Sequence, residues 1–416
     1  MTNNLSVSLN SSNEGRFDAP ASERSEELVP PDVLLVICHL GHGGAQRVVC
    51  NLANALCRQG YRVTILLTAR RDNNALNLDP SVRLEFLVYD PPRWSFAHLA
   101  GLYHMGRWLP KLRARIKRIN ALCVVSFIRP TNVQVLIAFL GLRDRRIIVC
   151  ERNDPQRQVL GRHWALLSRL LYRTADLVTF NSEGVRSSLA AYVPEGKLHY
   201  LPNILTIPAS QCIEQFPGPV VLAVGRLVPQ KGYDVLIKAF AQVRERMADW
   251  RLVFLGEGPQ EAELRKLAEN LGVAARIEWR GHVANPFAFY RGASIFVLPS
   301  RYEGMPNALL EAMSFGLPAI VSDASPGPLE VIDQGENGLI VPTDDVAELA
   351  AALAHLAGDE ATRKRLGAAA RQRVQAFLPD RAINDWAIAI GLSENRQQED
   401  FAKPHGKVER QQTRVH

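Results

Sequence analysis

Two glutamates eight positions apart, Glu303 and Glu311, are the residues of this sequence best suited to chemistry. Between them, residues 304–307 form a short polar loop that leads into small and apolar residues at helical spacing, and Gly316 with Pro318 is typical of a helix end. Carboxylates beside the free N–H groups of a helix start would bind hydroxyl groups and an anion. The stretch therefore predicts a site for a polyol that carries a phosphate.

The residues around this loop predict where it lies. Residues 293–298 and 318–321 are apolar runs typical of buried strands. A strand, a loop, a helix and a strand make one unit of a parallel sheet, so Glu303 follows the carboxyl end of a strand, where open α/β sheets bind ligands. The alternative is a solvent-facing helix start, where glutamate is favourable in any case.

A second pair of charged residues, Arg226 and Lys231, lies in a comparable turn. An apolar run over residues 219–224 leads into Gly225 and the two cations, and a helix is predicted from Asp234 onward. Two cations around a glycine-containing strand-to-helix loop can converge on one anion, and a pyrophosphate is the natural candidate. The alternative is a solvated basic turn.

Gly43 and Gly44 occupy the first turn of this kind, between a strand over residues 33–38 and a helix over residues 45–58. Glycines there let the backbone come close to a ligand, although an ordinary tight turn would need them as well.

Polar residues also follow two later predicted strands. Arg129 and Asn132 follow residues 121–127, and Glu151 follows residues 146–150. They are candidates to line a cleft, and turn chemistry is the alternative.

The composition of the chain limits its class. With 416 residues and 47% hydrophobic residues, the chain is long enough for two or three domains. The six cysteines form no Cys-x-x-Cys pair, which indicates reduced, buried thiols and no metal site. No apolar run reaches about 18 residues, and the polar start lacks the pattern of a signal peptide. A cytoplasmic protein is expected.

The positive charge is concentrated in one part of the chain. Residues 33–204 hold 24 Lys and Arg against 10 Asp and Glu, a net charge of +14, while residues 205–416 hold 23 against 26, a net charge of −3. Within the basic part, residues 106–120 alternate basic and apolar side chains. This stretch would lie on an anionic membrane, or it is a surface helix with a solvated basic face.

Three motifs occur in an order that resembles the retaining nucleotide-sugar glycosyltransferases of family four: GGAQRVV at 43–49, GRLVPQKG at 225–232 and EGMPNALLEA at 303–312. The resemblance covers residues 33–392. ERNDP at 151–155 and the SF..PTN pattern at 126–132 are similar to a subgroup that builds bacterial surface polysaccharides on lipid carriers.

The resemblance implies an α/β fold of two facing Rossmann-like domains, the GT-B arrangement, whose C-terminal helix can cross back to the first domain. The expected parts are a disordered segment 1–31, an acceptor domain 32–205, a donor domain 218–377, a terminal helix 378–392 and a disordered tail 393–416.

The resemblance also implies roles. Arg226 and Lys231, beside Gly225, would bind the donor diphosphate and stabilise the leaving group, and Glu311 would hold the ribose. Glu303 would contact the donor sugar. Gly304, Met305, Pro306 and Asn307 would lie beside that sugar, and Gly43 with Gly44 would approach the diphosphate and acceptor from the opposing domain.

The sequence departs from the family at two positions. Gln46 replaces a glutamate that many relatives carry, which we expect to be structural. The loop that holds a cleft histidine in many relatives contains none here, and Arg129 or Asn132 is only a guess for its replacement.

The expected function is retaining transfer of a hexose or N-acetylhexosamine from a nucleotide sugar, UDP-linked, to a hydroxyl of a lipid-linked or growing bacterial surface saccharide. Neither a metal nor another cofactor is expected, because two cations and helix dipoles neutralise the diphosphate. No nucleic-acid partner is expected, and the protein would lie at the inner face of the cytoplasmic membrane. The alternatives are a sugar-nucleotide epimerase or hydrolase and a non-catalytic scaffold of a polysaccharide assembly complex.

Overall fold

The computed structural model describes residues 30–41, 43–69, 78–87, 98–141, 144–153, 162–207, 212–283 and 285–392. The chain divides between Pro30 and Pro31, and the fold is that of the part from Pro31 onward. The predicted disorder of residues 1–29 and 393–416 lies outside the described residues.

The first sheet has seven parallel strands in the order β3-β2-β1-β4-β5-β6-β7. The strands are β1 (Val33–Ile37), β2 (Val63–Leu67), β3 (Arg83–Phe86), β4 (Cys123–Phe127), β5 (Arg146–Cys150), β6 (Leu177–Phe180) and β7 (Leu198–Tyr200). Strands buried on both faces have continuous apolar sequences, and that is why β1, β2 and β4 were predictable. The edge strand β3 was not predicted, because it is only partly buried and two of its four residues are charged.

Helices cover both faces of this sheet. They are α1 (Gly44–Arg58), α2 (His98–Ile119), α3 (Arg129–Ala138), α4 (Arg162–Leu171) and α5 (Glu183–Ala190). Helix α1 packs in one core with α13 (Pro379–Ile390), whose Trp386 is fully buried there, and α2 and α3 pack in the core on the other face. The return of the last helix to the first sheet is therefore confirmed.

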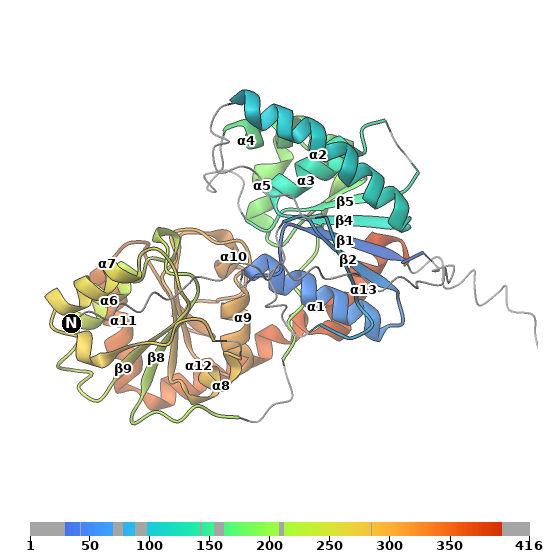
Figure 1. The fold of residues 1–416 in the computed structure, drawn as a ribbon. Coiled ribbons are helices and arrows are strands. Elements are labelled where there is room, and N and C mark those ends of the chain that lie inside the picture. Colours follow the sequence, from blue (N-terminus) through green and yellow to red (C-terminus); the bar gives the residue numbers. More distant parts are fainter. Residues whose placement is uncertain are drawn as a thin grey trace, which may run out of the picture. The chain divides into compact units, whose positions relative to one another are not determined.

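The second sheet has six parallel strands in the order β10-β9-β8-β11-β12-β13. The strands are β8 (Val220–Val224), β9 (Arg251–Leu255), β10 (Ile277–Trp279), β11 (Ile295–Leu298), β12 (Ala319–Ser322) and β13 (Gly338–Val341). The helices are α6 (Tyr233–Gln242), α7 (Glu261–Asn270), α8 (Phe287–Gly292), α9 (Asn307–Ser314), α10 (Pro326–Leu329), α11 (Val346–Gly358) and α12 (Glu360–Arg373). Figure 1 shows β8 and β9 between α6, α7 and α11 on one face and α8, α9 and α12 on the other. The predicted fold class, α/β with two parallel sheets, is confirmed.

The order of the strands reverses between β8 and β11, since the chain builds β9 and β10 on one side of β8 and β12 and β13 on the other. At such a switch point the two loops that follow the central strands diverge, and ligands bind there. The loop after β8 contains Gly225 to Lys231, and the loop after β11 contains Ser300 to Pro306. Both predicted donor motifs therefore lie at one switch point.

The basic stretch 106–120 belongs to α2, and its apolar residues face the protein interior. Trp108 is 6% exposed, and Leu112 and Ile116 are fully buried, whereas Lys111 and Lys117 are exposed. None of these three apolar residues is available to insert into a membrane, whereas the two lysines face solvent, and contact of this basic face with an anionic membrane stays a prediction. No helix among the described residues has the length and apolarity to cross a bilayer.

Two local predictions are wrong. Residues 129–132, predicted as a polar loop, form the first turn of α3, because Pro130 suits the start of a helix. Cys212 is exposed, whereas the composition predicted buried thiols throughout; the six cysteines, which all lie within the described ranges, form no disulfide.

Candidate active site

Lys231 and Glu303 meet at the switch point of the second sheet. Lys231 ends the 3-10 turn Pro229–Lys231 after β8, and Glu303 lies in the loop after β11. The Lys231 ammonium lies 2.5 Å from the Glu303 Oε1 atom, which also accepts a hydrogen bond of 2.7 Å from the Ser300 hydroxyl. The two side chains are 14% and 8% exposed. The structure thus joins the predicted diphosphate lysine to the predicted sugar glutamate.

Arg226 lies next to Gly225 in the same loop and is exposed. Among the described residues it has no ion-pair partner. Gly225 has φ 155°, a conformation that L side chains rarely adopt, so the turn requires glycine. The guanidinium therefore remains available to an external anion beside Lys231.

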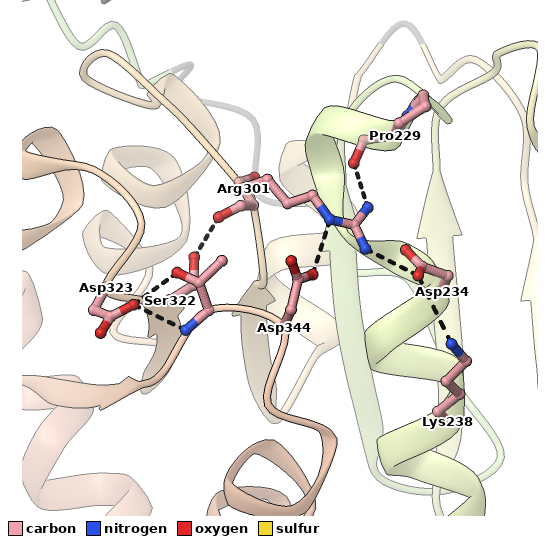
Figure 2. Close-up of polar contacts among 9 residues, drawn as sticks. Pro229, Asp234, Lys238, Arg301, Ser322, Asp323 and Asp344 are labelled. Atoms are coloured by element: carbon pink, nitrogen blue, oxygen red, sulfur yellow. Dashed lines mark hydrogen bonds and ion pairs between the residues drawn. The ribbon is translucent and has the colours of Figure 1, made fainter. Parts of the chain in front are cut away.

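The Arg301 side chain clamps the two loops together, as Figure 2 shows. Its guanidinium donates to the Pro229 carbonyl at 2.6 Å, to Asp234 Oδ2 at 3.0 Å and to Asp344 Oδ1 at 2.8 Å. The Arg301 backbone N–H also donates to the Gln230 carbonyl at 2.7 Å. Two of these four bonds connect the loop that carries Glu303 to the turn that ends in Lys231, and the other two reach Asp234 on α6 and Asp344 after β13.

Glu311 is held from both sheets. Arg47 on α1 donates to Glu311 Oε1 at 2.5 Å, and the Tyr290 hydroxyl donates to Glu311 Oε2 at 3.0 Å. The Glu311 side chain is 3% exposed and the Arg47 side chain is 25% exposed. The attraction of Glu311 raises the pKa of the Arg47 guanidinium, which stays charged. The ribose predicted to bind Glu311 would therefore have to displace Arg47 or share the carboxylate with it.

The helix start at Asn307 makes a second contact between the sheets. The Asn307 amide donates to the Gly44 carbonyl at 3.0 Å, and Asn203 donates to the Met305 carbonyl at 2.9 Å and to Asn307 Oδ1 at 2.7 Å. A Cβ atom on Gly304 would lie 2.2 Å from the Arg152 carbonyl oxygen, so this position requires glycine. The structure therefore brings predicted donor residues and the Gly44 loop together.

The remaining predicted cleft residues form a buried network. Arg129 pairs with Glu151 at 3.2 Å, both side chains being 2% exposed. The Tyr172 hydroxyl donates to Glu151 at 3.1 Å and accepts from the Asn132 amide at 3.1 Å. Burial, followed by the nearby Glu151 charge, raises the pKa of Tyr172 well above its usual value, so the phenol stays a donor. These side chains therefore bond to one another inside the protein, although the Asn132 Oδ1 atom is buried without a hydrogen-bond partner among the described residues.

Sequence reasoning missed Arg47, Tyr290 and Arg301. Arg47 lies inside the GGAQRVV motif, so a basic residue in the first glycine turn was an available signal. Tyr290 and Arg301 act through partners distant in the chain, for which the sequence holds no local pattern. No group of three or more His, Cys, Asp or Glu within the described ranges is arranged to hold a metal ion.

The fold and the site correspond to known protein families. Residues 42–205 match the model described as Glycosyltransferase Family 4, and residues 214–373 match the model described as Glycosyl transferases group 1. The two models match in tandem over two parallel-sheet α/β units. The chain is a glycosyltransferase of the GT-B class.

Particular relatives resemble most of the chain. The chain is 27% identical over 375 residues to a Campylobacter jejuni protein, and the match covers 87% of this chain and 99% of that protein. The Campylobacter protein is named GalNAc-alpha-(1->4)-GalNAc-alpha-(1->3)-diNAcBac-PP-undecaprenol alpha-1,4-N-acetyl-D-galactosaminyltransferase. This chain is 29% identical over 369 residues to an exopolysaccharide phosphotransferase of Streptomyces coelicolor, covering 83% of this chain but only 39% of the longer protein.

Solved structures share the fold. A sucrose-phosphate synthase of Thermosynechococcus elongatus superposes with a TM-score of 0.69 at 22% identity, covering 89% of this chain and 98% of the other. HepE of Anabaena, solved with UDP and glucose, superposes with a TM-score of 0.70 at 18% identity, covering 87% of this chain and 99% of HepE. At these identities the likeness concerns the fold.

Proposed function

We propose that the protein transfers a hexose or N-acetylhexosamine from a nucleotide sugar, UDP-linked, to a hydroxyl of a lipid-linked or growing bacterial surface saccharide, with retention of the anomeric configuration. The observation that carries the proposal is the Lys231–Glu303 pair with the exposed Arg226 beside it, at the switch point of the second sheet. The GT-B class supplies the reaction type.

The two cations would assist departure of the diphosphate. Breaking the bond between the sugar and the diphosphate places negative charge on the leaving group, and fixed cations in a site with little water stabilise that charge. Lys231 is neutralised by Glu303 in the ligand-free chain. Diphosphate binding therefore draws the ammonium toward phosphate and leaves the Glu303 carboxylate for the hydroxyls of the transferred sugar. This chemistry needs no metal ion.

The arrangement of the two glutamates argues for transfer rather than hydrolysis. Hydrolases use two carboxylates that flank the scissile bond. Here Glu303 pairs with Lys231, while Glu311 is buried and held by Arg47 and Tyr290. Glu311 is thus suited to hold ribose hydroxyls rather than to protonate a leaving oxygen. The acceptor hydroxyl would enter on the face that the diphosphate leaves, beside the Gly43–Gly44 loop.

Relatives and charge support the acceptor class. The Campylobacter relative is named for transfer to an undecaprenol-linked saccharide, and the Streptomyces relative is named as an exopolysaccharide phosphotransferase. The basic first part of this chain, including exposed Lys111 and Lys117 on α2, would favour an anionic carrier at the inner face of the cytoplasmic membrane. This contact would be electrostatic, since the apolar residues Trp108, Leu112 and Ile116 are buried.

The experiment is incubation of the purified full chain with radiolabelled UDP-sugars and GDP-sugars, with and without bacterial membrane lipid extract. Label that enters the lipid phase only when extract is present supports transfer. Free or isomerised sugar formed without acceptor indicates the hydrolase or epimerase, and no turnover with any donor indicates the scaffold.

Two further measurements test the finer parts of the proposal. Nuclear magnetic resonance of the product linkage should show the same anomeric configuration as the donor; inversion would refute retention. Activity should persist in excess chelator, and its loss with recovery on adding a divalent ion would refute metal independence.

A further inference from the structure

Tyr233, the first residue of α6, has a buried hydroxyl that nothing in the described part of the chain satisfies. The residue is 2% exposed, and its hydroxyl oxygen has no hydrogen-bond partner there. Buried polar groups are hydrogen-bonded in the great majority of cases, and an unmade bond costs stability. A bound ligand could therefore supply the hydrogen-bond partner that this hydroxyl lacks.

This hydroxyl lies beside the candidate donor site. A Cβ atom built on Gly225 would lie 2.8 Å from the Tyr233 oxygen and 3.0 Å from the Lys231 Cε atom. The hydroxyl and the aliphatic end of Lys231 thus meet at the open side of Gly225, where a larger residue would block the approach. Gly225 itself is partly exposed.

The Tyr233 ring is fixed in this position. Its edge packs against Phe254 with ring centroids 5.0 Å apart and an angle of 61° between the planes. Burial, followed by the nearby Glu303 charge, raises the pKa of Tyr233, so the hydroxyl stays protonated at neutral pH and is available as a donor. A rigid, protonated donor beside a lysine suits a phosphate oxygen.

We infer that Tyr233 is a further binding residue for the donor: its hydroxyl donates a hydrogen bond to a diphosphate oxygen of a nucleoside diphosphate lying over Gly225. This inference rests on the proposed function. When the diphosphate draws the Lys231 ammonium away from Glu303, the lysine side chain leaves Gly225 and uncovers the hydroxyl. The buried hydroxyl thereby gains its missing partner only in the complex.

The test is Tyr233→Phe, which removes one oxygen and keeps the ring. Isothermal titration calorimetry with UDP, GDP and UMP should show about five- to tenfold weaker binding of whichever nucleoside diphosphate the wild type prefers, as for one net hydrogen bond. The affinity for UMP, which lacks the second phosphate, should fall less in the variant than the affinity for UDP or GDP. The melting temperature should stay equal or rise, because an unsatisfied buried group is removed. Tyr200→Phe, with a partly exposed ring on the first sheet, is the matched control and should change neither quantity.

Several outcomes would overturn the inference. Unchanged UDP and GDP affinity in Tyr233→Phe would do so, as would weaker binding of the nucleotide sugar without weaker binding of the free diphosphate, which would place the hydroxyl on the sugar. Lys231→Ala separates the two levels of the argument. If Lys231→Ala loses affinity and Tyr233→Phe does not, only the inference fails; if the wild type binds neither diphosphate, the proposed function fails with it.

Discussion

The two sheets have the same strand order around their central strands, yet loops at the carboxyl ends of their strands differ in chemistry. After β8 and β11 of the second sheet, Arg226 is exposed and Lys231 pairs with Glu303 near the surface. After β4 and β5 of the first sheet, Arg129 and Glu151 are buried and form an ion pair of 3.2 Å. The comparison teaches that loops at the carboxyl ends of parallel strands can either leave a cation such as Arg226 exposed or bury it in an ion pair, as with Arg129.

The largest expected effect is that of Lys231→Ala on turnover. Removal of one preorganised cation from the leaving group should lower kcat by about 10²- to 10³-fold. The measurement is initial rate with the donor identified by the radiolabel assay. Arg265→Ala, on exposed helix α7, is the control and should leave the rate unchanged. Normal turnover of Lys231→Ala would remove the second switch point from the active site.

The counterpart in the first sheet is Arg129→Ala, which should act on stability. It leaves Glu151 as an unpaired buried carboxylate, and breaking a buried pair in this way costs about 3–5 kcal/mol. Urea denaturation followed by circular dichroism measures the loss. If Arg129→Ala instead folds with normal stability and loses only acceptor affinity, the loops after β4 and β5 form a ligand site.

Arg301→Ala should weaken activity through position rather than direct contact. The variant loses the three guanidinium bonds, so the turn that ends in Lys231 is held less firmly against the loop that carries Glu303, and a misplacement of about 1 Å can cost up to about 10²-fold in rate. We expect kcat/KM to fall by about 10- to 100-fold. Arg301→Lys should recover only part of the lost kcat/KM, because one ammonium reaches fewer of the acceptors than a guanidinium does. Equal rates for wild type and Arg301→Ala would contradict a positioning role of Arg301.

The smallest expected effect is that of Arg47→Ala on nucleotide affinity. Arg47 reaches from the first sheet to Glu311, so a ribose must compete with an ion pair whose carboxylate is buried and whose arginine side chain is 25% exposed. Removing the competitor should tighten UDP or GDP binding by up to about fivefold in calorimetry. Weaker binding would mean that Arg47 itself contacts the nucleotide, which would make the site a product of both sheets.

Much of the fold was predictable because it depends on local pattern. Parallel strands buried on both faces have continuous apolar sequences, so β1, β8 and β11 were visible. Glycine and proline mark the turns that follow them, and Arg226, Lys231 and Glu303 stand in those turns. The sequence by itself therefore determined the α/β class and the positions of the charged loops.

Only the tertiary structure decided which charges meet. The Arg47–Glu311 pair joins residues 264 positions apart, and Tyr290 completes it from a helix that no motif marks. The same holds for the burial of Arg129 and for the unpartnered hydroxyl of Tyr233. Spacing along the chain reports periodicity and turns, whereas burial and long-range pairing depend on how the elements pack. The structure alone thus distinguished the buried network around Arg129 in the first sheet from the less buried site at Lys231 and Glu303 in the second sheet.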